Sequence, residues 1–145
     1  MRFWLAAFVV VGAAVTAGQG EAARTVWDGV YSEEQALRGE RLYAAQCSRC
    51  HGGTLLGGEA PALIGPLFAA NWDGASLADL FDRTRTTMPQ DGPGSLSRQQ
   101  TADLLAYMLL AGKFPASGTP LGTDSGALAQ ITYVSIRPQP KEGSR

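Results

Sequence analysis

The sequence predicts an all-α domain, and three observations support this fold class. The chain has 145 residues, enough for one domain with a single core, and we find no internal repeat. Apolar residues make up 45% and charged residues 17%, the balance of a globular protein. Three segments each begin with a helix-capping signal, which is followed by apolar residues at helical spacing.

The first of these helices is expected from Ser32 to about Cys47. Ser32 is the expected N-cap residue. Gln35 is at N3, where its side chain would accept the N-cap backbone N–H in a capping box. One face of this helix carries Gly39 and Tyr43. A glycine inside a helix costs about 1 kcal/mol relative to alanine, so its presence suggests that another helix crosses closely there.

Two further helices follow an irregular segment, rich in glycine and proline, at residues 52–65. The second begins at Ser76 and must stop before Pro89, because the residue preceding a proline is pushed out of the helical conformation. The third begins at Ser97 and ends near Gly112, which stands where a C-cap is expected.

Both ends of the chain differ from this helical region. Residues 1–22 read as an export signal: one basic residue, an apolar run of roughly a dozen residues and small residues at two possible cleavage points, after Ala17 or Ala22. The helical domain is expected at residues 23–113. A Gly-, Pro- and Ser-rich C-terminal extension of irregular structure follows at 114–145, and its apolar patch at 131–136 is long enough to pack on the domain. We therefore expect an exported, periplasmic protein.

Composition excludes several classes of function. Twelve basic and 13 acidic residues give a net charge of −1, which provides no basic footprint for nucleic acid. The mature chain has no apolar run near the ~20 residues of a membrane span. Two cysteines cannot build a disulfide framework, and one histidine rules out a site with several imidazole ligands.

The two cysteines and the histidine occupy one short motif, Cys47-Ser48-Arg49-Cys50-His51. This C-x-x-C-H pattern is typical of c-type haem attachment: two thiols three residues apart reach the two vinyl groups of one haem edge, and the imidazole lies beneath the iron. A thioredoxin-like motif would require a βαβ setting, and a zinc site would normally draw four ligands from two such clusters. We therefore expect one covalently attached haem c, with Cys47, Cys50 and His51 binding it.

From about Ser32 to Gly112 the chain resembles the class I, monohaem c-type cytochromes. The motifs that carry this resemblance are the haem motif, a Gly-x-x-x-aromatic pattern (Gly39, Tyr43) before it and a Leu-x-x-aromatic pattern (Leu104, Tyr107) in the last helix. The resemblance implies a class I cytochrome c fold, in which helices wrap around one covalently bound haem and the first and last helices cross.

The resemblance also implies a second axial ligand, a methionine on a distal loop. The chain has three methionines, of which Met1 leaves with the signal and Met108 falls on the apolar face of the last helix. Met88 is followed by Pro89 and matches the Met-Pro ligand segment of that family. We expect iron to be held by His51 and Met88; the alternative leaves water or nothing on the second face.

Other positions carry weaker expectations. The carbonyl of Pro61 resembles the acceptor of the proximal imidazole N–H in that family, with Pro66 as a rival. Trp72 stands where relatives place an aromatic donor near a haem propionate, although core packing explains it equally well. Arg83 and Arg85 have the charge to pair with propionates, or they are simply solvated near a helix end.

We expect an electron-transfer protein with no catalytic residues, in which Fe(II)/Fe(III) cycling carries single electrons from a dehydrogenase to an oxidase or another cytochrome of the respiratory chain. Residues 26–32 resemble the lead-in of small cytochromes that accompany quinoprotein dehydrogenases, so the donor is expected in that class. One alternative is a haem subunit held permanently in a dehydrogenase or oxidase complex. Another is a haem enzyme or gas sensor with an open iron position.

Overall fold

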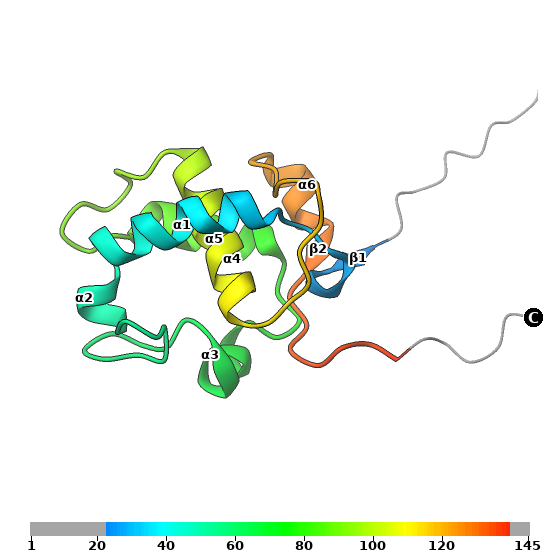
Figure 1. Cartoon of the computed structure of the whole chain (residues 1–145), viewed down its shortest axis with the longest axis horizontal. Helices are drawn as coiled ribbons and strands as arrows, with labels where there is room; N and C mark the ends of the chain where they lie inside the picture. The colour runs from blue at the N-terminus through cyan, green and yellow to red at the C-terminus, as the bar shows by residue number, and fades with distance from the viewer. Residues whose placement is uncertain (1–22, 140–145) are drawn as a thin grey trace, which may run out of the picture.

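The computed structural model describes residues 23–139, and helices dominate this part of the chain (Figure 1). The expected class I cytochrome c architecture is confirmed. The predicted export signal lies in residues 1–22, outside the described residues. In chain order the elements are β1 (Arg24–Thr25), the 3-10 turn η1 (Val26–Asp28), α1 (Glu33–Gln46), α2 (Ser48–His51), α3 (Gly65–Trp72), α4 (Leu77–Thr87), α5 (Arg98–Ala111), α6 (Ser125–Ala129) and β2 (Ile131–Thr132).

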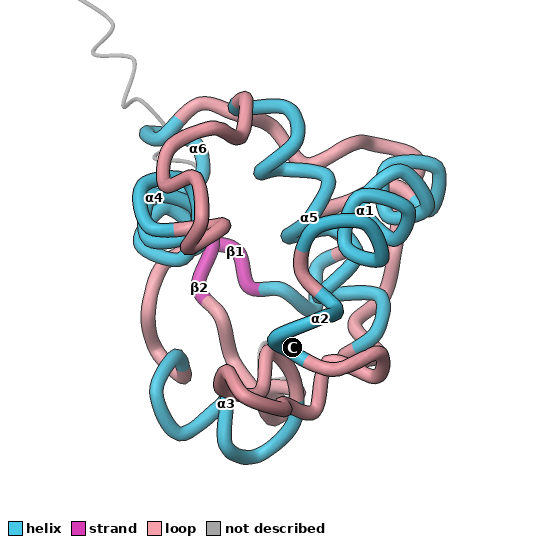
Figure 2. The backbone as a smooth tube through the Cα atoms, turned by 90° about the vertical axis from the view of Figure 1, so that its left-hand side faces the viewer, coloured by secondary structure: helices cyan, strands magenta, loops and turns pink. Residues whose placement is uncertain are grey.

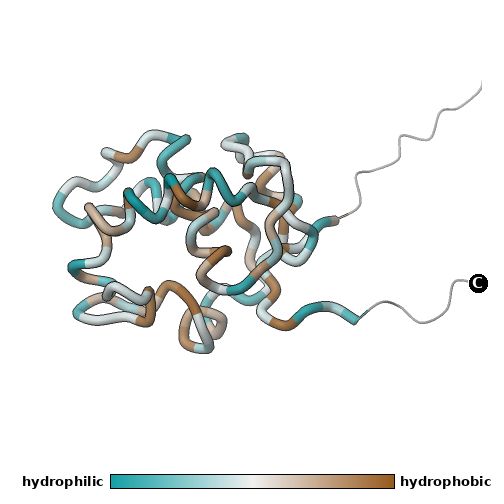
Figure 3. The backbone as a smooth tube through the Cα atoms, viewed as in Figure 1, coloured by the Kyte–Doolittle hydropathy of each residue, from teal (hydrophilic) through white to brown (hydrophobic). Residues whose placement is uncertain are grey.

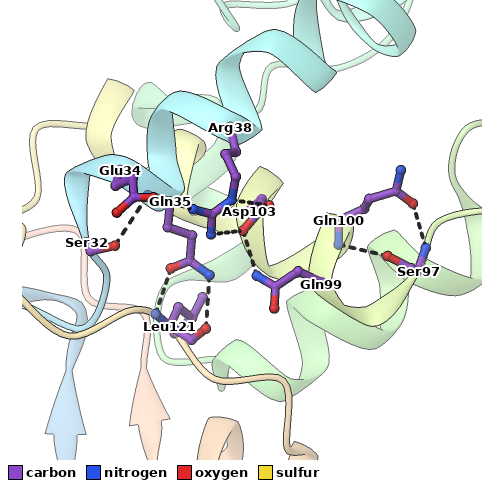
Figure 4. Close-up of polar contacts among 9 residues, drawn as sticks. All are labelled: Ser32, Glu34, Gln35, Arg38, Ser97, Gln99, Gln100, Asp103 and Leu121. Carbon is purple, nitrogen blue, oxygen red and sulfur yellow. Dashed lines mark hydrogen bonds and ion pairs between the residues drawn. The ribbon is translucent and has the colours of Figure 1, made fainter.

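Helices α1 and α5 cross at Gly39, as the sequence suggested. A Cβ atom built on Gly39 would lie only 1.8 Å from the carbonyl oxygen of Asp103, so no other residue fits there. Beside the crossing, the Arg38 guanidinium binds both carboxylate oxygens of Asp103 at 3.0 Å, and Gln99 donates to the same carboxylate at 2.8 Å (Figure 4). Helices α1 and α5 are thus fixed to each other by close packing and by a buried carboxylate.

The side chain of Gln35 has a different role from the one its position predicts. Ser32 does cap α1, accepting the Gln35 backbone N–H at 3.3 Å. The Gln35 amide, however, does not return to the cap: it donates to the Leu121 carbonyl at 3.0 Å and accepts the Leu121 N–H at 2.6 Å (Figure 4). The expected capping box is therefore wrong, because the buried backbone of the C-terminal extension takes both hydrogen bonds of this amide.

The other two capping signals are confirmed. Ser76 and Ser97 each cap their helix in a reciprocal capping box, and α4 ends at Thr87, just before Met88 and Pro89. Helix α3 is an element that the sequence reading missed. It begins at a glycine and a proline with no side-chain N-cap, so it carries no capping signal.

The C-terminal extension packs on the domain as far as Ser135 and contains more regular structure than its composition predicted. Strand β2 pairs in parallel with β1 beside α6 (Figure 1). Trp27 donates its indole N–H to the Val134 carbonyl at 2.8 Å, and Tyr31 donates its hydroxyl to the Phe114 carbonyl at 2.7 Å. Of the apolar patch at 131–136, Ile131 and Tyr133 are buried as expected, whereas Ile136 is exposed. The extension thus ties the start of the domain to its end.

The helices surround an apolar interior. In the view of Figure 2, α1 and α5 lie side by side, α4 and α6 lie opposite them, and α3 closes the base. Hydrophobic residues gather in the segment that leads into α3 and on α5 (Figure 3). Within residues 23–139 no helix has the length and apolar character needed to cross a bilayer.

Candidate haem-binding site

The haem motif is placed by the junction of two helices. Cys47 ends α1, and the single turn α2 that follows carries Cys50 and His51. The His51 backbone N–H donates to the Cys47 carbonyl at 3.0 Å, so the cysteines and the imidazole share one turn. Both thiols are free, and burial, with a smaller contribution from Cys50, raises the pKa of Cys47 to about 11. Neither sulfur is consumed by a disulfide, which leaves both for thioether bonds.

The His51 ring is oriented by one hydrogen bond. The side chain is buried, with 8% of its surface exposed, and Nδ1 lies 2.7 Å from the Pro61 carbonyl oxygen. A carbonyl can only accept, so Nδ1 carries the proton and Nε2 keeps its lone pair. The structure thus selects Pro61 over Pro66, which instead lies in the first turn of α3. This arrangement fits an imidazole that binds iron through Nε2.

Glycines let the following loop fold back tightly against the motif. A Cβ atom on Gly58 would lie 2.9 Å from the Cys50 carbonyl oxygen, and one on Gly52, at a φ of +81°, would lie 2.6 Å from the Gly57 carbonyl oxygen. Tyr43 donates its hydroxyl to the Gly52 carbonyl at 2.6 Å and so links α1 to the same loop. These contacts, which sequence reasoning did not identify, hold the haem motif and its loop as one unit.

An apolar cavity lies between the loop before α3 and helices α4 and α5. Its walls carry only aliphatic, aromatic and thioether side chains, apart from one tyrosine hydroxyl. They are formed by Leu63, Ile64, Phe68, Leu80, Leu105, Met108, Leu109, Phe114 and Tyr133. The cavity is small, about 10 Å³, and its side chains are of the apolar kind that packs against the hydrophobic face of a porphyrin.

Met88 directly follows α4 as its C-cap and is half-buried; its backbone N–H donates to the Thr84 carbonyl at 2.9 Å. The next residue, Pro89, lines a surface cleft together with Arg49 and Asp91, whose charged groups lie 3.6 Å apart. Arg49 stands between the two cysteines of the motif. The structure therefore brings the Met88 segment beside the haem motif through the pairing of Arg49 with Asp91, a contact that the sequence did not signal.

The remaining candidates are distributed as follows. Met108 is buried in α5 at the cavity wall. Trp72 ends α3 and stacks on Phe68 with ring centroids 6.0 Å apart, which supports core packing for this side chain. Arg83 is exposed, whereas Arg85 is partly buried and its Nε has no hydrogen-bond partner within residues 23–139.

These residues fit a covalently bound haem c. Two free thiols share a turn with an imidazole whose Nε2 keeps its lone pair. The domain also contains an apolar cavity, and among residues 23–139 the buried Nε of Arg85 has no hydrogen-bond partner. Fold and site together define a monohaem class I c-type cytochrome. Residues 34–108, about half the chain, match the family model described as Cytochrome C oxidase, cbb3-type, subunit III, and the chain belongs to that family of c-type cytochrome domains.

No curated protein and no solved structure matches the chain. The cytochrome domain makes the chain a haem-based electron-transfer protein with redox protein partners, and its cofactor is covalently bound haem c.

Proposed function

We propose that this protein is a periplasmic cytochrome that carries single electrons, with the haem iron held by His51 and Met88. The observation that carries the proposal is the position of the Met88 segment, which meets the haem motif at the cleft formed by Arg49, Pro89 and Asp91. A methionine in that segment would supply a thioether sulfur to the iron that His51 binds.

The chain's own residues then account for outer-sphere electron transfer. Haem c supplies a one-electron Fe(II)/Fe(III) couple, and Met/His ligation raises its potential. His51, fixed by the Pro61 carbonyl, would bind the iron through Nε2, and Met88, which directly follows α4, would bind it through sulfur. With both residues bound, the iron would have no open position for a substrate. Apolar side chains packed against the haem would disfavour the extra charge of ferric iron.

Electrons are proposed to enter and leave at the haem edge near the thioether bonds. Arg49, between the two cysteines, has 83% of its side chain exposed, so this part of the motif reaches the surface. Complexes between redox partners are small and transient, which agrees with a limited contact area of this kind. A dehydrogenase, of the quinoprotein class by the resemblance at residues 26–32, is the proposed donor, and an oxidase or another cytochrome is the acceptor.

The second candidate is a haem subunit bound permanently in a dehydrogenase or oxidase complex. The family description, which names a subunit of an oxidase, favours it. Gel filtration of the mature protein separates the two candidates: a carrier elutes as a monomer, whereas a subunit deprived of its partner exposes apolar surface and self-associates.

The absorption spectrum of the oxidised, purified protein tests the ligand pair. A near-infrared band from sulfur-to-iron charge transfer is the expected result. The reduced protein is expected not to bind carbon monoxide rapidly at neutral pH. Rapid binding would contradict ligation by Met88 and favour a haem enzyme or gas sensor with an open iron position.

A further inference from the structure

Arg85 carries an unusual polar atom. Its Nε is buried and has no hydrogen-bond partner. Among the described residues that are not exposed, it is the one side-chain nitrogen or oxygen in this situation. Burying part of a guanidinium without a partner is costly, because the group gives up water and gains nothing in return. The ion pairs within residues 23–139 involve Arg38 and Arg49, and none involves Arg85. Such a donor indicates an acceptor that the polypeptide itself does not supply.

The position of Arg85 shows where that acceptor lies. Arg85 is in the last turn of α4, three residues before Met88, and residues at this spacing are neighbours on one helix face. Leu80, on the preceding turns of the same helix, lines the apolar cavity. Along α4, Arg85 thus falls between Leu80, a residue of the cavity wall, and the proposed sulfur ligand Met88.

We propose that the Arg85 guanidinium binds a propionate carboxylate of the haem. Propionates are the only anionic groups that haem brings, and the planar fork of arginine matches a carboxylate in two parallel hydrogen bonds. This proposal rests on ligation by Met88, because that bond places the porphyrin within one helical turn of Arg85. Arg85 is therefore a positioning residue: it fixes the orientation of the ring in the cavity and holds positive charge beside it.

One competing explanation uses the helix alone. A cation in the last turn of a helix is favoured by the partial negative charge of the terminal carbonyls. That effect requires charge only, and it leaves the guanidinium in water rather than partly buried. Arg83, two residues earlier on the same helix, is exposed and carries the same charge, so it provides a matched control.

The test compares midpoint potentials of Arg85→Gln, Arg83→Gln and wild-type holoprotein at pH 7. Positive charge at the ring disfavours ferric iron, so Arg85→Gln should shift the ferric/ferrous equilibrium at least tenfold toward ferric, or ~59 mV for a one-electron couple. Arg83→Gln should shift it less than twofold, since an exposed charge is screened. Equal shifts in the two variants, or no shift in Arg85→Gln, would overturn the proposal.

A second variant, Arg85→Lys, keeps the proposal testable if the Arg85→Gln protein does not accumulate as folded holoprotein. Arg85→Lys keeps the charge and removes the planar fork, so the proposal expects a shift of at least threefold with the near-infrared band retained. A wild-type potential in Arg85→Lys would overturn it. Absence of that band in the wild type is a separate outcome, which contradicts ligation by Met88 rather than the role of Arg85 alone.

Discussion

The Nδ1–H of His51 donates to the Pro61 carbonyl oxygen at 2.7 Å. This hydrogen bond spans the glycine-rich loop and determines both the tautomer and the direction of the imidazole. Because the acceptor belongs to the backbone, its position depends on the fold of the whole loop rather than on one side chain. The helices that hold this loop therefore bear directly on the haem site.

Replacing Gly39 with alanine should disrupt the crossing of α1 and α5. The new methyl group would lie 1.8 Å from the Asp103 carbonyl oxygen, so one helix backbone must move. We expect a loss of about 3 kcal/mol or more in the free energy of unfolding, measured by denaturant titration of the holoprotein. Gly122→Ala, where the methyl group meets nothing within 4 Å, is the control and should change stability by at most about 0.5 kcal/mol.

The two internal methionines should respond differently to substitution by alanine. Met88→Ala should abolish the near-infrared band, lower the potential and let the reduced protein bind carbon monoxide. Met108→Ala removes a side chain that is buried in α5. It should lower the free energy of unfolding by about 2–5 kcal/mol and leave the band in place. If Met108→Ala lost the near-infrared band while Met88→Ala kept it, the ligand would be Met108 rather than Met88.

Removing the Gln35 amide should loosen the C-terminal extension. Gln35→Leu leaves the Leu121 N–H and carbonyl without their partners in the interior. We expect destabilisation of about 1–3 kcal/mol for each unpaired group, together with faster proteolysis of the extension. Gln90→Leu, at an exposed turn, serves as the control. Equal stability of the two variants would show that the amide does not hold the extension.

Stability should fall in alkaline solution because of the buried tyrosines. Burial, with smaller contributions from Cys47 and Tyr107, raises the pKa of Tyr43 to about 12, while an unfolded tyrosine titrates near pH ~10. Above that pH the unfolded chain loses a proton that the folded protein retains, so the free energy of unfolding declines as pH rises.

Unfolding titrations of wild type and Tyr43→Phe between about pH 8 and 11 check this expectation. The variant loses the hydrogen bond to the Gly52 carbonyl and should be about 1 kcal/mol less stable at neutral pH. Its stability should decline less steeply as pH rises. Identical slopes would mean that Tyr43 does not contribute to the alkaline decline.

Local signals in the sequence predicted much of this fold. Ser76 and Ser97 cap their helices with their own neighbours, and Gly39 implied a helix crossing because a glycine there has no local benefit. Features that depend on distant residues were not predictable. The Gln35 amide follows its partner in the extension rather than its own cap, and α3 begins without a capping side chain.

The candidate site shows the same contrast between local signals and features that depend on distant residues. The haem motif is contiguous, so its residue types and spacing were sufficient to indicate the cofactor. The choice of Pro61 over Pro66 required the path of the loop, and the pairing of Arg49 with Asp91 required the position of the Met88 segment. The unpartnered nitrogen of Arg85 became visible only once its surroundings were known.

The central claim is that one haem is bonded to Cys47 and Cys50. Intact-mass spectrometry under denaturing conditions tests it most directly, on protein made in a host that matures c-type cytochromes and compared with Cys47→Ala/Cys50→Ala. The account predicts the mass of the chain plus one haem, located by peptide mapping to residues 47–51, and a bare chain for the double variant. A wild-type chain without the mass of haem would contradict it.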